Sequence, residues 1–139
     1  MKELVFIVLS LKDASGKVIS SNIYWISPDK NYSPMSEMQE TPVNVRITDE
    51  RKTGSDISWT VEVSNPGSRL AFFIRSQIVT GGEEVLPSLW SRNYFSLAPG
   101  ESTVVNVTCP QAGLKDNNPV LRISGWNVKT VETPAAKGY

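Results

Sequence analysis

The chain of 139 residues is 40% hydrophobic and 20% charged, a length and composition typical of one globular domain. Its 14 Lys and Arg residues balance 14 Asp and Glu residues, and the longest basic run is the pair Arg51-Lys52. Nucleic-acid binding needs a basic face that displaces counterions, so the sequence argues against a nucleic-acid partner.

The first apolar segment, Leu4 to Leu11, is predicted to be a β-strand rather than a secretory leader. It is short, it ends in Lys12-Asp13, and no small-residue cleavage site follows it. About eight residues are also too few to span a bilayer, so no membrane partner is expected. A tight turn at residues 13–16, in which Gly16 can take a positive φ, leads to a second strand.

Both faces of this first strand are apolar, which is unusual for a strand with one face in water. Side chains two residues apart share a face of a strand. The two sets are Leu4, Phe6 and Val8 on one face and Val5, Ile7, Leu9 and Leu11 on the other. Either the strand lies centrally under a long loop, or its outer face contacts something that is absent from this chain.

A period of two continues through most of the chain, as in 55–65, where Trp59 falls on the apolar phase and is predicted to lie in the core. Residues 27–42 hold three prolines and lack periodicity, so they are predicted to form a long loop. The predicted strands lie at about 3–12, 17–26, 43–50, 55–65, 70–79, 101–109 and 119–127. The sequence therefore predicts an all-β chain, a single immunoglobulin-like antiparallel β-sandwich of about seven strands over residues 1–139.

Residues 85–97 are rich in large apolar side chains but lack a sustained strand period. A loop with this much apolar surface usually packs against a core or against a partner.

Groups that carry out chemistry are scarce. The chain has no histidine, which removes Ser-His-Asp and Cys-His arrangements and all His-containing metal sites. The single Cys109 excludes an intrachain disulfide and is predicted to be a small buried hydrophobe. The adjacent carboxylates Glu83-Glu84 and Asp49-Glu50 are interpreted as solvated turn charge rather than a glycosidase pair. We expect no catalytic residue, no cofactor and no metal.

Several short sequence segments occur along the chain in this order: 16–20, 22–25, Asn65-Pro66, 71–75, 84–87, 93–102 and Gly125-Trp126-Asn127. Together they resemble the C-terminal immunoglobulin-like domain of glycoside hydrolase family 2 enzymes, in the branch of β-mannosidases and exo-β-D-glucosaminidases. The resemblance covers about residues 4–128, and the block from Asn93 to Ser102 is fairly specific.

The resemblance implies that the chain is a C-terminal fragment of a larger multidomain enzyme whose catalytic barrel lies outside it. The implied role is a non-catalytic accessory domain that packs against the other domains of the parent glycosidase in carbohydrate degradation. For that parent, a periplasmic or secreted location is favoured over the cytoplasm. The family pattern has Asp before Asn-Tyr-Phe, whereas this chain has Arg92, which leaves the role of that position open.

In such an enzyme the unexplained apolar regions would face neighbouring domains, and one of them should form a contiguous apolar patch. The candidate interface residues are Leu4, Phe6, Val8, Trp90, Arg92, Asn93, Tyr94 and Phe95. The alternative is a stand-alone carbohydrate-binding or adhesive immunoglobulin-like module, with carbohydrate as its partner. Tryptophans scattered over several strands, one of them predicted to be buried, speak against a sugar-stacking row.

Overall fold

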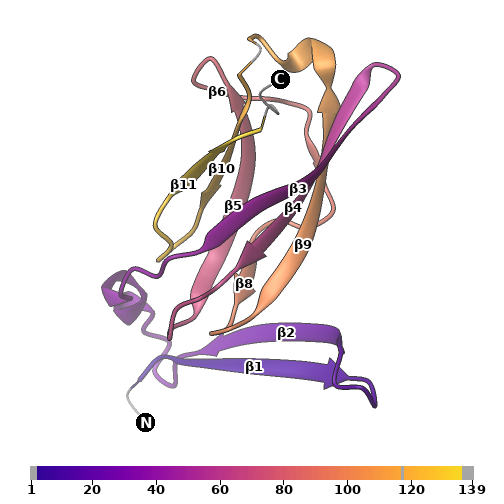
Figure 1. The fold of residues 1–139 in the computed structure, drawn as a ribbon. Coiled ribbons are helices and arrows are strands. Elements are labelled where there is room, and N and C mark those ends of the chain that lie inside the picture. The colour runs from indigo at the N-terminus through magenta and orange to yellow at the C-terminus, as the bar shows by residue number, and fades with distance from the viewer. Residues whose placement is uncertain (1–2, 117, 136–139) are drawn as a thin grey trace. The chain divides into compact units, whose positions relative to one another are not determined.

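The computed structural model describes residues 3–116 and 118–135 (Figure 1). The chain divides into two compact units, Met1–Gln39 and Glu40–Tyr139.

The first unit is built on an antiparallel hairpin of β1 (Val5–Lys12) and β2 (Val18–Ile26). Asp13 fixes the turn between them, because its Oδ1 accepts hydrogen bonds from the N–H groups of Ser15 at 2.9 Å and Lys17 at 3.0 Å. Gly16 takes a φ of 85°, as the turn prediction required. The loop that follows contains a short 3-10 helix, η1 (Ser33–Glu37).

The second unit contains two sheets that face each other (Figure 1). The first sheet has the order β3 (Asn44–Thr53), β4 (Asp56–Ser64), β9 (Ser102–Pro110) and β7 (Leu89–Trp90). The second has the order β11 (Val131–Pro134), β10 (Val120–Ser124), β5 (Ala71–Thr80) and β6 (Glu83–Glu84), and β8 (Phe95–Leu97) also pairs with β5. All of these strand pairs are antiparallel, and the 3-10 helix η2 (Gln111–Gly113) follows β9.

The core lies between these two sheets. Every second residue of β4 is buried, and β4 contributes Trp59 to a cluster that includes Val107 from β9, Ile78 from β5 and Ile123 from β10. The indole N–H of Trp59 donates to the carbonyl of Ala135 at 2.9 Å and to Glu50 Oε2 at 3.0 Å, so the one polar atom of this side chain is satisfied. The period-two pattern and the core position of Trp59 are confirmed.

The all-β, immunoglobulin-like prediction is also confirmed, but the strands are distributed differently. The strands predicted at 3–12 and 17–26 form, yet among the described residues they pair with each other in a separate two-stranded sheet. The strand predicted at 119–127 ends at Ser124, because the chain turns at Gly125. A Cβ on Gly125 would lie 3.0 Å from the carbonyl oxygen of Phe72, so only glycine allows this close approach.

Candidate functional site

The first candidate region is the β1–β2 hairpin. Directly paired residues share a face, so Phe6 lies beside Trp25 and Val8 beside Ile23. Leu4 precedes β1, and Leu4 and Phe6 are half-buried whereas Val8 is exposed. The structure thus places the three predicted hairpin residues along one side of β1.

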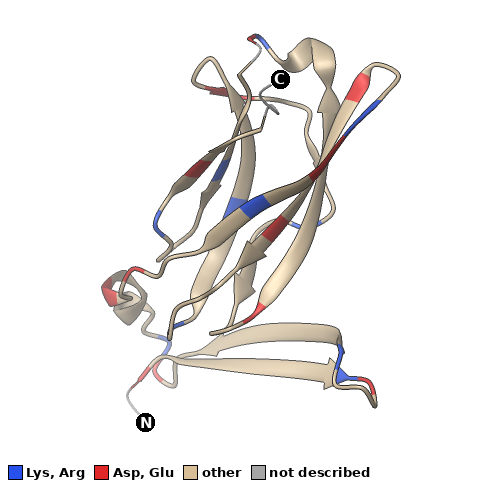
Figure 2. Ribbon diagram, in the orientation of Figure 1, with Lys and Arg blue, Asp and Glu red and all other residues tan. Residues whose placement is uncertain are grey.

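The hairpin strands expose apolar side chains on both faces. Of the large hydrophobic side chains exposed among the described residues, more than half lie on these two strands: Ile7, Val8, Leu9, Leu11, Val18, Ile19, Tyr24, Trp25 and Ile26. Figure 2 shows that Lys, Arg, Asp and Glu are absent from the strands up to Leu11 and from Val18, and gather at the turn. This two-sided, uncharged apolar surface is the main exposed apolar feature of the described residues.

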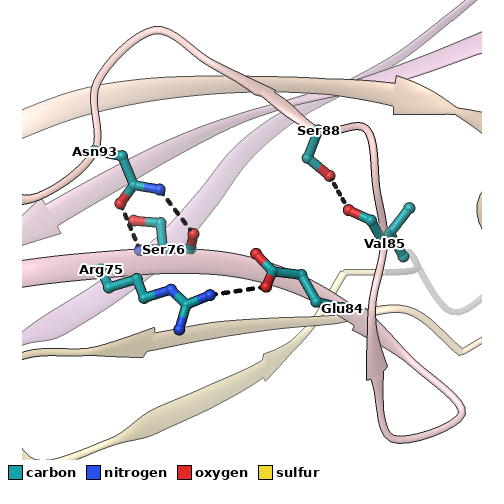
Figure 3. Close-up of polar contacts among 6 residues, drawn as sticks. All are labelled: Arg75, Ser76, Glu84, Val85, Ser88 and Asn93. Atoms are coloured by element: carbon teal, nitrogen blue, oxygen red, sulfur yellow. Dashed lines mark hydrogen bonds and ion pairs between the residues drawn. The ribbon is translucent and has the colours of Figure 1, made fainter.

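The second candidate region is the segment from Trp90 to Phe95 in the second unit. Asn93 fixes it to the middle of β5 (Figure 3): its Oδ1 accepts a hydrogen bond from the N–H of Ser76 at 2.8 Å, and its Nδ2 donates to the carbonyl of Ser76 at 3.0 Å. The side-chain amide thus replaces the peptide group of a neighbouring strand. Asn93 is half-buried, and its amide is used inside the unit rather than at an outer surface.

Two further contacts stabilise the same part of the second sheet (Figure 3). Arg75 forms an ion pair of 2.8 Å with Glu84, which connects β5 to β6. The hydroxyl of Ser88 donates to the carbonyl of Val85 at 2.5 Å. The hydroxyl of Ser76 is buried and has no hydrogen-bond partner among the described residues. These contacts hold residues 84–93 against the sandwich without presenting a reactive group.

The remaining predicted residues of this segment separate into buried and exposed ones. Phe95 is only 4% exposed and belongs to the core, so its assignment as an interface residue is corrected: alternation along β8 directs it inward. Trp90 is partly buried and also packs against the core. Arg92 and Tyr94 are exposed. Arg92 and Tyr94 are therefore the most accessible side chains of this segment for a partner.

The side chain of Arg92 contacts Phe95 and Thr103. Its guanidinium carbon lies 5.2 Å from the centre of the Phe95 ring, and its Nη1 donates to Thr103 Oγ1 at 3.3 Å. A cation above an aromatic face is attracted by the ring quadrupole. Arg92 therefore covers the outer side of a core aromatic residue.

The sequence pattern identified Tyr94 as a candidate interface residue, but it did not indicate that the exposed ring of Phe73 pairs with it. Their centroids are 5.5 Å apart, the side chains are 42% and 53% exposed, and both residues have positive φ, 57° and 53°. Bulky residues rarely adopt this left-handed region. The pairing of β5 with β8 shifts register between Ala71 and Ile74, and this irregularity accompanies the outward turn of Phe73. The only signal in the sequence was the unbroken pair Phe72-Phe73.

Groups that could carry out chemistry are dispersed. The described residues contain no cluster of three or more His, Cys, Asp or Glu side chains that could hold a metal ion. Among the same residues, no helix has the length and apolar character needed to cross a membrane. Burial raises the pKa of the Cys109 thiol, and the nearby Asp56 carboxylate adds to this shift.

Comparisons with known proteins relate most of the chain to one family of domains. The profile described as "Exo-beta-D-glucosaminidase Ig-fold domain" matches residues 22–128. An exo-beta-D-glucosaminidase of Amycolatopsis orientalis is 36% identical over 147 aligned residues, which cover 90% of this chain and 14% of that protein. A second, from Streptomyces avermitilis, is 34% identical and covers 92% of this chain and 17% of that protein.

A solved structure gives the same relation. The exo-chitosanase CsxA of Amycolatopsis orientalis matches with a TM-score of 0.77 and 29% identity over 89% of this chain and 17% of the CsxA chain. The present chain therefore spans between 14% and 17% of the length of these relatives.

Proposed function

Because the chain belongs to the family of exo-β-D-glucosaminidase Ig-fold domains, we propose that it is a non-catalytic accessory domain of a larger glycosidase that acts on β-D-glucosaminides. The observation that carries this proposal is the match over residues 22–128 in a chain that spans only 14% of its relative's length. The resemblance to glycoside hydrolase family 2 is confirmed for the exo-β-D-glucosaminidase branch; the β-mannosidase branch is not needed to explain it.

The environment of the carboxylates supports a non-catalytic role. Glycoside hydrolysis uses two carboxylates that flank one bond. Glu83 pairs with Lys115, which lowers the pKa of that carboxyl, whereas its neighbour Glu84 pairs with Arg75. Glu50 accepts the indole N–H of Trp59. Glu83, Glu84 and Glu50 are thus each engaged in a separate structural contact.

A surface pocket between β4, β9 and residues 87–89 offers no alternative catalytic centre. This pocket of about 140 Å³ is lined by Asp56, Pro87, Leu89, Thr108, Cys109 and Pro110. Asp56 is the only carboxylate among these lining residues, and the Cys109 thiol is held protonated by its raised pKa. Neither an acid–base pair nor an activated nucleophile is assembled there.

In this proposal the two units act together as one C-terminal module of the parent enzyme and orient its other domains. The test is to assay this chain and the full-length enzyme on a chromogenic β-D-glucosaminide at equal molar concentration. We expect turnover by the full-length enzyme only. Hydrolysis by the pure chain would reject the non-catalytic role, and a gene that encodes no catalytic domain beside this segment would reject the accessory role.

A second candidate function, carbohydrate binding, is favoured by the exposed pair Phe73 and Tyr94, because aromatic faces can stack on sugar rings. Calorimetric titration with glucosamine and mannose oligosaccharides separates the two functions. An accessory domain gives no saturable heat. Saturable binding that disappears in Tyr94→Ala would instead support a carbohydrate-binding module.

A further inference from the structure

We propose that the β1–β2 hairpin is the element by which this module docks onto the rest of the parent enzyme's own polypeptide, through an apolar surface that lacks charged side chains. The inference rests on the proposed accessory function and makes it specific, because it assigns docking to the hairpin strands rather than to the faces of the sandwich.

The hairpin differs from β4 of the second unit in which side chains are exposed to water. Along β4 each buried residue is followed by a partly exposed one, and the partly exposed set is polar: Ser58, Thr60, Glu62 and Ser64. Along β1, by contrast, Ile7, Val8 and Leu9 are consecutive and all exposed. A two-stranded sheet is marginally stable in water without a covered hydrophobic face. The hairpin strands are therefore built for a covered environment.

The missing cover is best supplied by the same polypeptide. The relatives show that a chain of this family is about one sixth or less of a longer protein, so most of the enzyme lies outside the structure. A surface tethered in the same molecule is present at an effective concentration of about millimolar, which a second copy of the chain does not reach at ordinary protein concentrations. The occupant we assign is therefore another part of the parent enzyme.

The charge pattern defines the chemistry of that occupant. Neither the segment 4–11 nor the segment 18–27 contains Lys, Arg, Asp or Glu. A charged group buried against such strands would lose its hydration without gaining a partner. The surface that covers them must therefore be apolar or neutral.

The tip of the hairpin marks where the docked surface ends. Lys12, Asp13 and Lys17 are exposed, and the Asp13 carboxylate is already occupied by the hydroxyl of Ser15 and the backbone N–H groups of Ser15 and Lys17. These contacts lower the pKa of Asp13, the Ser15 hydroxyl contributing most. The turn is thus suited to remain in water while the strands are covered.

Hydrogen exchange tests the proposal without any mutation. Exchange is followed by mass spectrometry in this chain alone and in the full-length enzyme. We expect the amides of β1 and β2 to exchange roughly tenfold or more slowly in the full-length enzyme, with the turn at 13–16 unchanged. If the strands exchange equally in both proteins, the proposal is overturned.

A pair of matched variants gives an independent measurement. Leu9 on the hairpin and Val104 on β9 are 55% and 58% exposed, but Val104 lies directly opposite Glu62, which pairs with Arg46 in a solvated setting. In the full-length enzyme Leu9→Asn should lower the thermal midpoint and speed exchange of the hairpin, whereas Val104→Asn, which adds no charge opposite Glu62, should change neither. Equal effects of the two variants would contradict hairpin docking.

The outcomes also separate this inference from the proposed function. Slower exchange of the outer sandwich strands instead of the hairpin would overturn the inference but leave an accessory domain. No difference anywhere between the chain and the full-length enzyme would overturn both. Hairpin protection that rises with enzyme concentration, together with a dimer in light scattering, would overturn the inference in favour of a second copy.

Discussion

Buried asparagines connect loops to the sandwich where strand pairing ends. Asn127 Oδ1 accepts the N–H of Phe72 at 2.8 Å, and its Nδ2 donates to the carbonyl of Leu70 at 2.8 Å. Asn65 Nδ2 donates to the carbonyls of Arg69 at 2.7 Å and Leu97 at 2.9 Å. An amide side chain suits this role because it offers a donor and an acceptor at once. These two residues, which the family motifs contain, thus have a structural explanation.

Replacement of Asn65 by alanine should therefore be costly. The Leu97 carbonyl and the N–H of Gly67, which Asn65 Oδ1 accepts at 2.9 Å, would lose their partner. We expect Asn65→Ala to lower the free energy of unfolding by about 3 kcal/mol. Urea denaturation followed by circular dichroism measures this. Asn44→Ala, at an exposed asparagine of β3, is the control and should change it by less than about 0.5 kcal/mol.

Asp116 links stability to pH. The hydroxyl of Thr80 and the N–H groups of Asn118 and Gly81 hydrogen-bond to its carboxylate, and the Thr80 contact contributes most to lowering its pKa below the ordinary 3.8. Because the folded-state pKa is lowered, the stability that Asp116 contributes is present above pH 3.8 and is lost as the pH falls through the folded-state value.

Asp116→Asn should therefore flatten the fall in thermal midpoint below about pH 4. Scanning calorimetry from pH 7 to pH 2 checks this, with Asp49→Asn as the control for removing an exposed carboxylate. An unchanged acid profile in Asp116→Asn would contradict the assignment.

Strand β5 uses a side chain for part of its backbone pairing. Asn93 supplies the partner for both backbone groups of Ser76 on one side, while β10 pairs with β5 on the other, where Ile123 lies opposite Ser76. Beside Ser76, the amide side chain of Asn93 thus takes the place of a neighbouring strand in the hydrogen bonding of β5.

Removal of this contact should loosen β5 locally. In Asn93→Ala we expect the amide of Ser76 to exchange at least about tenfold faster, because its N–H would lose the Oδ1 acceptor, while amides of β4 keep their rates. Residue-resolved hydrogen exchange measures both. Faster exchange throughout the sandwich would instead indicate that Asn93 supports global stability.

Strand positions could be predicted from the sequence where hydrophobic and polar side chains alternate. They could not be predicted where polar side chains replace the backbone hydrogen bonds of a neighbouring strand. β4 and β9 lie within one residue of their predicted bounds, because a period of two identifies a strand with one buried face. β11 was missed, since four residues that end in proline give little signal. The segment 85–97 contains two short strands, β7 and β8, and it is held by the side chains of Asn93 and Ser88 rather than marked by a period in the sequence.

The candidate interface residues show the same limit. The continuous apolar run was enough to predict that Phe6 and Val8 lie on a strand with two apolar faces, whereas Leu4 lies just before that strand. Phe95 could not be placed, because its burial depends on the register of β8 against β5. The outward turn of Phe73 follows from a register shift that no local pattern records.

At the scale of the whole second unit, one core joins the two sheets. Ile123 of β10 is fully buried in the same cluster as Trp59 of β4, although the two strands belong to different sheets. Ile123→Ala should lower the free energy of unfolding of this unit by about 3 kcal/mol through lost burial and a residual cavity.

Urea denaturation checks this, with Val104→Ala on the outer face as a control within about 0.5 kcal/mol of wild type. Fluorescence and circular dichroism should give the same shift in midpoint, because both sheets depend on the shared core.

Cys109 is buried in β9 opposite Ile57, and its pKa is raised by that burial. Because the Cys109 side chain is only 1% exposed, we expect a bulky thiol reagent to modify it mainly when the residues around it open. The rate at which an aromatic disulfide labels Cys109 therefore reports on this opening. It can be measured in the intact enzyme without an engineered probe. A docked partner that stabilises the second unit should lower this labelling rate, whereas a partner that stabilises only the hairpin should leave the rate unchanged.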